Sequence, residues 1–135
     1  MSGPRITPAQ ALEMHKQFLR SILQDVMTVL AAGEPGPERL VRALEAYWAS
    51  CLRQRDQRVA VQAAVAGTTI EDSVEPMGRP FRMMLQAELE PQKRADAEAL
   101  AQWIYDEARA IAVDEAVTGE PEAGRRYAVI SRILR

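Results

Sequence analysis

The sequence of 135 residues contains one cysteine, one histidine and few aromatic residues, and each shortage excludes a class of protein. A single cysteine cannot form a disulfide within the chain, and zinc fingers and C-x-x-C redox motifs need at least two. A single histidine excludes metal sites that use a pair of histidines. Aromatic residues make up 5% of the chain, which disfavours an all-β domain. We therefore expect no metal site.

Long apolar runs are also missing. No stretch of about 18 apolar residues occurs, and the first residues lack the pattern of a signal peptide. We therefore expect a cytoplasmic protein that does not enter a membrane. The formal net charge is −2, with 8 basic and 6 acidic residues in 1–60, 5 and 12 in 61–120, and 4 and 1 in 121–135. Because no face is densely basic, we expect no direct binding to nucleic acid.

Catalytic patterns are absent as well. The glycines match neither G-x-G-x-x-G nor the P-loop pattern, and no G-x-S-x-G elbow occurs. Neighbouring acidic residues such as Asp106 and Glu107 point about 100° apart on a helix, so they do not form a converged pair. We predict that the protein is not an enzyme and needs no cofactor. A nucleophile built from Cys51 and His15 stays open as the weakest alternative.

The patterns that the sequence does contain are mostly those of helices, and the length of the chain suits one domain. Thr7 is a good N-cap, Gln10 completes a capping box, and Gly33 is a good stop, which together predict a helix over residues 8–32. We expect its buried stripe to be Leu12, Leu19, Leu23, Val26 and Leu30.

The remaining helix-start and helix-stop residues predict five more helices. Pro37 opens a helix with a central stripe of Leu40, Leu44, Tyr47 and Cys51. Asp56 caps a short helix over 57–66, with Val59, Ala63 and Ala66 on one apolar side and Val61 and Val65 beside them. The last three helices are expected over 80–90, 91–118 and 122–134. We therefore predict a single all-α domain over residues 1–135, with a disordered segment 1–6 and an irregular loop 67–79.

The helix predicted over 91–118 is apolar over an arc of about 200°, twice what one core face requires. Such a helix is usually covered on two sides, once by its own domain and once by a partner subunit. The basic helix over 122–134 is expected to dock beside it, on its own chain. We predict a homodimer with an interface of Leu100, Ile104, Ala108, Ile111, Tyr127 and Ile130.

Several residues fit a simple core poorly and are candidates for ligand contacts. His15 lies at the edge of the first stripe, where a half-buried, satisfied histidine is the plainer interpretation. Glu107 lies on the apolar arc, and a buried, unpaired carboxylate is costly. It is therefore exposed at a groove, paired with an arginine, or aimed into a cavity. Arg53, Arg55 and Arg58 are interpreted as a solvated helix end. The candidate ligand-binding residues are His15, Trp48, Cys51, Met84, Trp103 and Glu107, although large residues at helical spacing are more often plain core.

The order of helices resembles the C-terminal, ligand-binding and dimerisation domain of TetR-type transcriptional regulators. The segments that carry the resemblance are Phe18–Leu30, a Gly/Pro break, Pro37–Trp48, Asp56, Phe81–Leu89 and 91–118. It implies a helical fold, a cavity between helices and a homodimer built from the last long helices. The family's DNA-binding helix-turn-helix has no counterpart before residue 8. The leading hypothesis is a regulatory domain that binds a small, mostly apolar ligand or pairs with a full-length regulator. The alternative is a helical accessory protein without a small-molecule site.

Overall fold

The computed structural model describes residues 6–71, 79–90 and 95–135 of the chain. These residues form six helices and no strand, which confirms the prediction of an all-α protein with about six helices. The helices are α1 (Pro8–Leu30), α2 (Pro37–Arg53), α3 (Arg55–Val65), α4 (Arg79–Leu89), α5 (Ala97–Thr118) and α6 (Ala123–Leu134).

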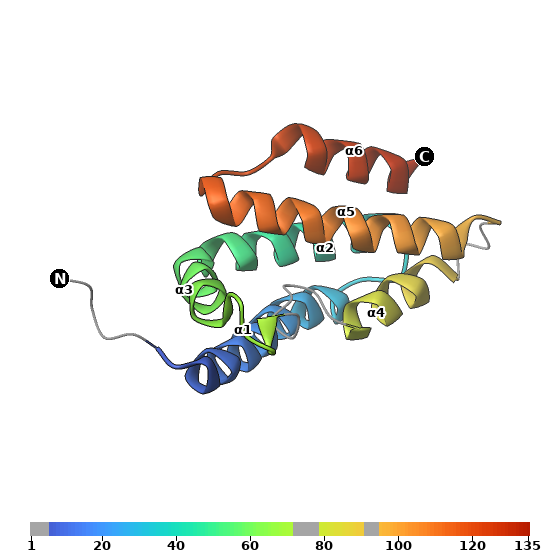
Figure 1. Cartoon of the computed structure of the whole chain (residues 1–135). Coiled ribbons are helices and arrows are strands. Elements are labelled where there is room, and N and C mark those ends of the chain that lie inside the picture. Colours follow the sequence, from blue (N-terminus) through green and yellow to red (C-terminus); the bar gives the residue numbers. More distant parts are fainter. Residues whose placement is uncertain (1–5, 72–78, 91–94) are drawn as a thin grey trace.

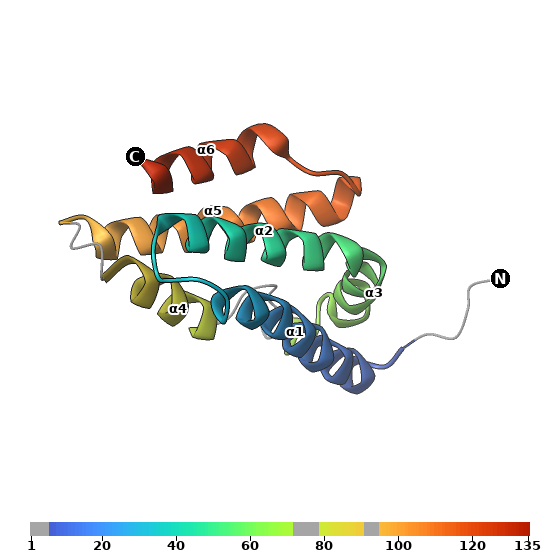
Figure 2. The same cartoon turned by 180° about the vertical axis from the view of Figure 1, so that it is seen from behind.

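Helices α2 and α5 form the middle of the molecule (Figure 1, Figure 2). On one side of them lies α6, and on the other lie α1 and α4, with α3 at one end of the bundle. The main core joins buried side chains of α1, α2, α4, α5 and α6. A smaller cluster of Ala11, Val61 and Val65 joins α1 to α3, and Ile6 packs against it. Of the predicted disordered segment only Ile6 is described, so residue 6 is part of the fold.

Helix α1 begins as predicted and buries a different face. The Thr7 hydroxyl accepts a hydrogen bond from the Gln10 backbone N–H at 3.1 Å, and the Gln10 side chain accepts one from the Thr7 N–H at 2.9 Å. The prediction of its stripe is wrong except at Val26, because Leu23 is 38% exposed and the other leucines are half-buried. The buried residues are Ala11, His15, Phe18, Ile22 and Val26. The small Ala11 and the polar His15 face α3, which meets the helix on that side.

Helix α2 buries the predicted stripe of Leu40, Leu44, Tyr47 and Cys51. Only Gln54 separates it from α3, so Asp56 lies exposed in the first turn of α3 and does not cap it. The apolar side predicted for this helix is wrong at Val59, Ala63 and Ala66, which are all exposed, and right at their neighbours Val61 and Val65, which are buried. The buried side of α3 is Arg58, Val61 and Val65. The hydrophobic pattern is misleading here because an arginine occupies the inner face.

The second half of the chain differs from the prediction mainly at its helix starts. The loop 67–79 is described as far as Glu71, where residues 66–70 form turns and bends, and the rest of its irregular part lies outside the described residues. Residues 95–96 form a turn, so α5 begins at Ala97, later than the predicted start at 91. It ends at Gly119 as predicted, in the left-handed conformation with φ 78°. Helix α6 lies against α5 and α2, as predicted for the basic tail.

The wide apolar arc of α5 is covered within one chain. Helices α2, α3, α4 and α6 all pack against α5. Four of the residues predicted for a dimer interface are completely buried in the core, namely Leu100, Ile104, Ala108 and Ile111. That part of the interface prediction is wrong, because a second copy can dock only on side chains that reach the surface. Of the other two, Tyr127 is exposed and Ile130 is half-buried at the edge of the core.

Candidate functional site

Of the six residues predicted to contact a ligand, only His15 lines the hollow between α1 and α3. Trp48 and Cys51 are buried in the main core, whereas Met84 and Trp103 pack half-buried at its edge. Glu107 is half-buried on α5, and His15 belongs to the contact between α1 and α3. The pattern of large residues at helical spacing therefore reflects ordinary core packing.

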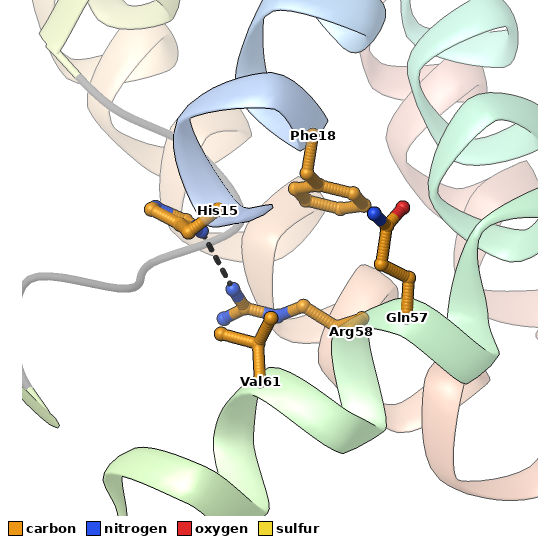
Figure 3. A pocket seen from close by; sticks show the side chains of 5 residues that line it. All are labelled: His15, Phe18, Gln57, Arg58 and Val61. Atoms are coloured by element: carbon orange, nitrogen blue, oxygen red, sulfur yellow. Dashed lines mark hydrogen bonds between the residues drawn. The ribbon is translucent and has the colours of Figure 1, made fainter. Parts of the chain in front are cut away.

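A hollow lies beside His15, between α1 and α3 (Figure 3). Its volume is about 140 Å³ including open solvent, and it is too tight to hold a water molecule. Ligand pockets usually measure about 300–1,000 Å³. The side chains that line it are His15, Phe18, Gln57, Arg58 and Val61. In this conformation the hollow cannot receive a small molecule.

His15 is held by Arg58 across this hollow. It is 3% exposed, so the expectation of a half-buried ring is wrong, although the ring is satisfied as expected. Arg58 Nη1 lies 3.2 Å from His15 Nδ1 (Figure 3). Because a guanidinium can only donate, Nδ1 accepts and the ring proton is on Nε2. Burial and the charge of Arg58 lower the pKa of His15 to about 4, so the ring is neutral at pH 7.

Cys51 is a core residue without nucleophilic character. The side chain is 5% exposed, and burial raises the pKa of its thiol to about 12. A thiol acts as a nucleophile only when ionised, which requires a lowered pKa and access. The chemical environment of Cys51 therefore opposes the nucleophile that the sequence left open.

Both tryptophans lie under arginines of α6. The Trp48 indole N–H donates to the carbonyl of Ala108 at 3.2 Å, and the Arg126 guanidinium lies 5.2 Å from the Trp48 ring centroid. Arg132 stands 4.3 Å from the centroid of the Trp103 ring. Cation–π contacts of this kind attach α6 to α2 and α5. The indole faces that a ligand would need are thus occupied by the chain itself.

Sequence reasoning missed Glu115, the most deeply buried charge of the described residues. Its side chain is 1% exposed and accepts from Arg126 through two bonds of 2.6 Å. The backbone N–H of Glu122 donates to the same carboxylate at 2.8 Å, so three donors satisfy it. The sequence carries a sign of this burial: Glu115 follows Ile111 by four residues and Ala108 by seven, which is the spacing of one helix face. A carboxylate in that register needs a partner across the helix contact.

A second, largely buried ion pair joins α4 to the first turn of α2. Arg39 donates to Glu88 through bonds of 2.5 Å and 3.2 Å. Its other Nη donates to the carbonyl of Leu30 at 2.9 Å and of Gly33 at 3.2 Å. Arg39 therefore supplies donors to backbone carbonyls at and just after the end of α1, and the same side chain binds α4 through Glu88. Nothing in the hydrophobic pattern of α2 predicts this role.

The three arginines near the α2–α3 junction behave differently from one another. Arg53 pairs with Asp25 at 2.7 Å on the surface, in keeping with a solvated helix end. Arg55 instead donates to the carbonyls of Ala116 and Val117 at 2.9 Å and 3.2 Å, at the end of α5. With the buried Arg58, it corrects the prediction that all three are solvated. Helix junctions expose backbone carbonyls that a long cation can reach.

The described part of the chain holds no group of three metal-binding side chains, and none of its helices has the length and apolarity needed to span a membrane. Neither a protein-family model, nor a curated protein, nor a solved structure matches this chain. The TetR resemblance therefore stays a prediction from the order of helices, and what the protein does must be inferred from its own surface.

Proposed function

We propose that this chain is a helical accessory protein that acts by docking to another protein and has no small-molecule site. The proposal is supported by the way the candidate ligand residues are used. Trp48 and Trp103 are covered by arginines, His15 accepts from Arg58, and Cys51 is a neutral core thiol. None of these contacts leaves a group facing an open cavity. Catalysis is not part of the proposal for the same reason.

The single observation that carries the proposal is the apolar outer side of α6. Tyr127 is 70% exposed and Leu134 is 52% exposed on that helix, with the half-buried Ile130 between them. A scattered exposed leucine needs no explanation, but large apolar residues aligned along one side of a helix favour a partner. A partner helix covering this side would remove the aligned side chains from water.

A thermal-shift screen with apolar and amphipathic small molecules tests the proposal. A ligand at about 100 times its dissociation constant stabilises the native state by about 2.7 kcal/mol and raises Tm by several degrees. We expect no compound to produce a saturable rise. One that does, and whose effect is lost in Trp103→Ala but not in Tyr127→Ala, would replace docking with ligand sensing.

The second candidate is a TetR-like regulatory domain that homodimerises, binds a small apolar ligand and modulates a full-length regulator. It is favoured by the all-α, six-helix architecture, which is the one expected for that domain. Its ligand would have to separate side chains that are packed together, so binding would be coupled to helix movement. The same screen distinguishes the two candidates, since only this one predicts a rise in Tm with a small molecule.

A further inference from the structure

Helix α3 is attached to the rest of the chain differently from the other five helices. It lies at one end of the bundle (Figure 1, Figure 2). Among the described residues, the main core takes its side chains from the other five helices and none from α3. The buried valines of α3, Val61 and Val65, pack instead with Ala11 of α1 in the smaller cluster. Detaching α3 would therefore open the smaller cluster and leave the main core packed.

The first residue of α3 has an anchor of its own. Gln54 alone separates α2 from α3. Arg55 donates to the carbonyls of Ala116 and Val117 at the end of α5, at 2.9 Å and 3.2 Å. The later turns of α3, residues 58–65, can therefore leave α1 while Arg55 keeps the start of the helix at α5.

The polar contact that holds α3 to α1 requires a neutral His15. Arg58 Nη1 donates to His15 Nδ1 over 3.2 Å (Figure 3). The ring of Phe18 lies near both, with its centroid 6.2 Å from that of His15 and 5.7 Å from the guanidinium carbon of Arg58. Protonation puts a hydrogen on Nδ1, so two positively charged donors would face each other. The hollow beside them is too tight for a water molecule that could separate them. This contact therefore excludes the protonated ring.

Arg58 is the charged group that faces His15 across the hollow. The hollow is lined by α1 and α3, and its other side chains, Phe18, Gln57 and Val61, are uncharged. Among the described residues that line it, none is a carboxylate that could stabilise a protonated ring. The other charged side chains of the neighbouring turns are engaged elsewhere, namely Glu13 with Lys16, Asp56 with Arg55, and Glu71 with the Gly67 N–H.

We propose that α3 is a proton-controlled arm: a proton on His15 detaches residues 58–65 from α1, while the other five helices stay packed. Detachment exposes the smaller cluster between α1 and α3 and brings His15 into water. There the ring binds a proton with the ordinary pKa of 6.5, whereas burial and Arg58 hold its pKa at about 4 in the attached state. Lowering the pH below 6.5 therefore favours the detached state. The arm and the outer side of α6 are separate features, so either can be present without the other.

Amide hydrogen exchange measures the opening of the arm separately from unfolding of the whole chain. Dividing each observed rate by the rate of an unstructured chain at the same pH gives the opening constant of each amide. Between pH 7 and pH 4.5 the opening constant of amides 59–65 is expected to rise about 60-fold, as the pKa values of about 4 and 6.5 require.

His15→Gln is the variant that removes the proton site. Its amide oxygen can still accept from Arg58, and the side chain does not titrate. We expect the opening constant of amides 59–65 to rise less than about fivefold in this variant over the same pH interval. A rise as large as that of the wild type overturns the role of the His15 proton.

Urea and a variant in the main core show whether α3 opens alone. Because the arm exposes little surface, urea up to about 1 M should hardly change exchange of amides 59–65, whereas amides in the middle of α2 and α5 should exchange faster. Val129→Ala, at a completely buried residue of the main core, should speed exchange in α2 and α5 and leave amides 59–65 unchanged.

If amides 59–65 follow those of α2 and α5 both in urea and in Val129→Ala, α3 separates only when the whole chain unfolds, and the arm is wrong. The urea comparison uses the wild type alone, so it decides this point even if His15→Gln does not fold.

Discussion

Two contacts between helices each hold an arginine, and the two arginines bind partners of opposite kinds, one charged and one neutral. Between α5 and α6, Arg126 meets the carboxylate of Glu115, so charge faces charge. Between α1 and α3, Arg58 donates to His15, whose neutral ring offers only a lone pair. The first contact is lost when its anion is removed, and the second is lost when its acceptor gains a proton. A guanidinium between helices is therefore sensitive to loss of an anion at one contact and to protonation of a neutral acceptor at the other.

The largest expected effect comes from breaking the charged contact. Glu115→Gln leaves Arg126 without a counter-charge and weakens the acceptor of the Glu122 N–H. Removing one partner of a buried pair costs about 3–5 kcal/mol, and we expect about 3 kcal/mol because Arg126 is partly exposed. The free energy of unfolding in urea measures the loss. A loss below about 1 kcal/mol would mean that this ion pair does not hold α6.

Lowering the pH should weaken the contact between Arg58 and the neutral ring of His15. The pKa of His15 is lowered to about 4 in the folded chain, against 6.5 for an ordinary histidine. Below pH 6.5 the unfolded chain therefore binds a proton that the folded chain refuses, and stability falls as the pH drops toward 4. At about 1.4 kcal/mol for each pKa unit the full effect is about 3.5 kcal/mol, of which about 2.4 kcal/mol is expected between pH 7 and pH 4.5. Urea midpoints at pH 7, 5.5 and 4.5 measure the slope.

His15→Gln is the matched variant for the acid effect, since the amide oxygen still accepts from Arg58 and does not titrate. Its stability should depend less on pH than that of the wild type between pH 6.5 and 4. If the two proteins lose stability in parallel over this interval, carboxylates elsewhere cause the acid effect and the His15–Arg58 contact does not.

A smaller effect is expected at the turn that leads from α5 into α6. Gly119 has φ 78°, and a Cβ there would lie 3.2–3.3 Å from the Arg55 guanidinium that binds the end of α5. Gly119→Ala should cost about 1–2 kcal/mol, through backbone strain and displacement of Arg55. Unfolding of Gly119→Ala and of Gly124→Ala gives the comparison, because Gly124 has open space around it and lies within a helix. Equal free energies of unfolding for the two variants would contradict the expected backbone strain at Gly119.

The smallest effect is expected at the exposed neighbour of Glu115. Asp114 pairs with Arg125 where both side chains are at least 37% exposed. Exposed pairs contribute less than about 1 kcal/mol, so Asp114→Asn should unfold close to the wild type. This variant also sharpens the comparison, since it removes the same charge one residue away. A loss as large as that of Glu115→Gln would show that net charge on α5 matters and burial does not.

How far the sequence predicts the structure depends on the kind of signal. The capping box at Thr7 and the stop at Gly119 are local, since each depends on backbone groups a few residues away, and each is present as predicted. The stripe of α2 is buried as predicted as well. The buried face of α1 is not local, because the helix carries two apolar rows and the approach of α2 and α3 decides between them. The candidate ligand residues were chosen from their spacing on single helices, which says nothing of partners on other helices. Trp48 bonds to the carbonyl of Ala108, and His15 bonds to Arg58.

The helical class and most of the helix ends could be predicted from the sequence, because helix formation depends on periodicity, caps and breakers that act within one or two turns. The sequence also predicted that α5 must be covered on more than one side. The packing of the helices shows that the cover comes from the same chain, that Glu115 and Arg58 lie inside, and that the apolar row left at the surface belongs to α6. These three features depend on which helix faces meet. A buried charge, for example, is tolerated only where the opposing helix places a partner beside it.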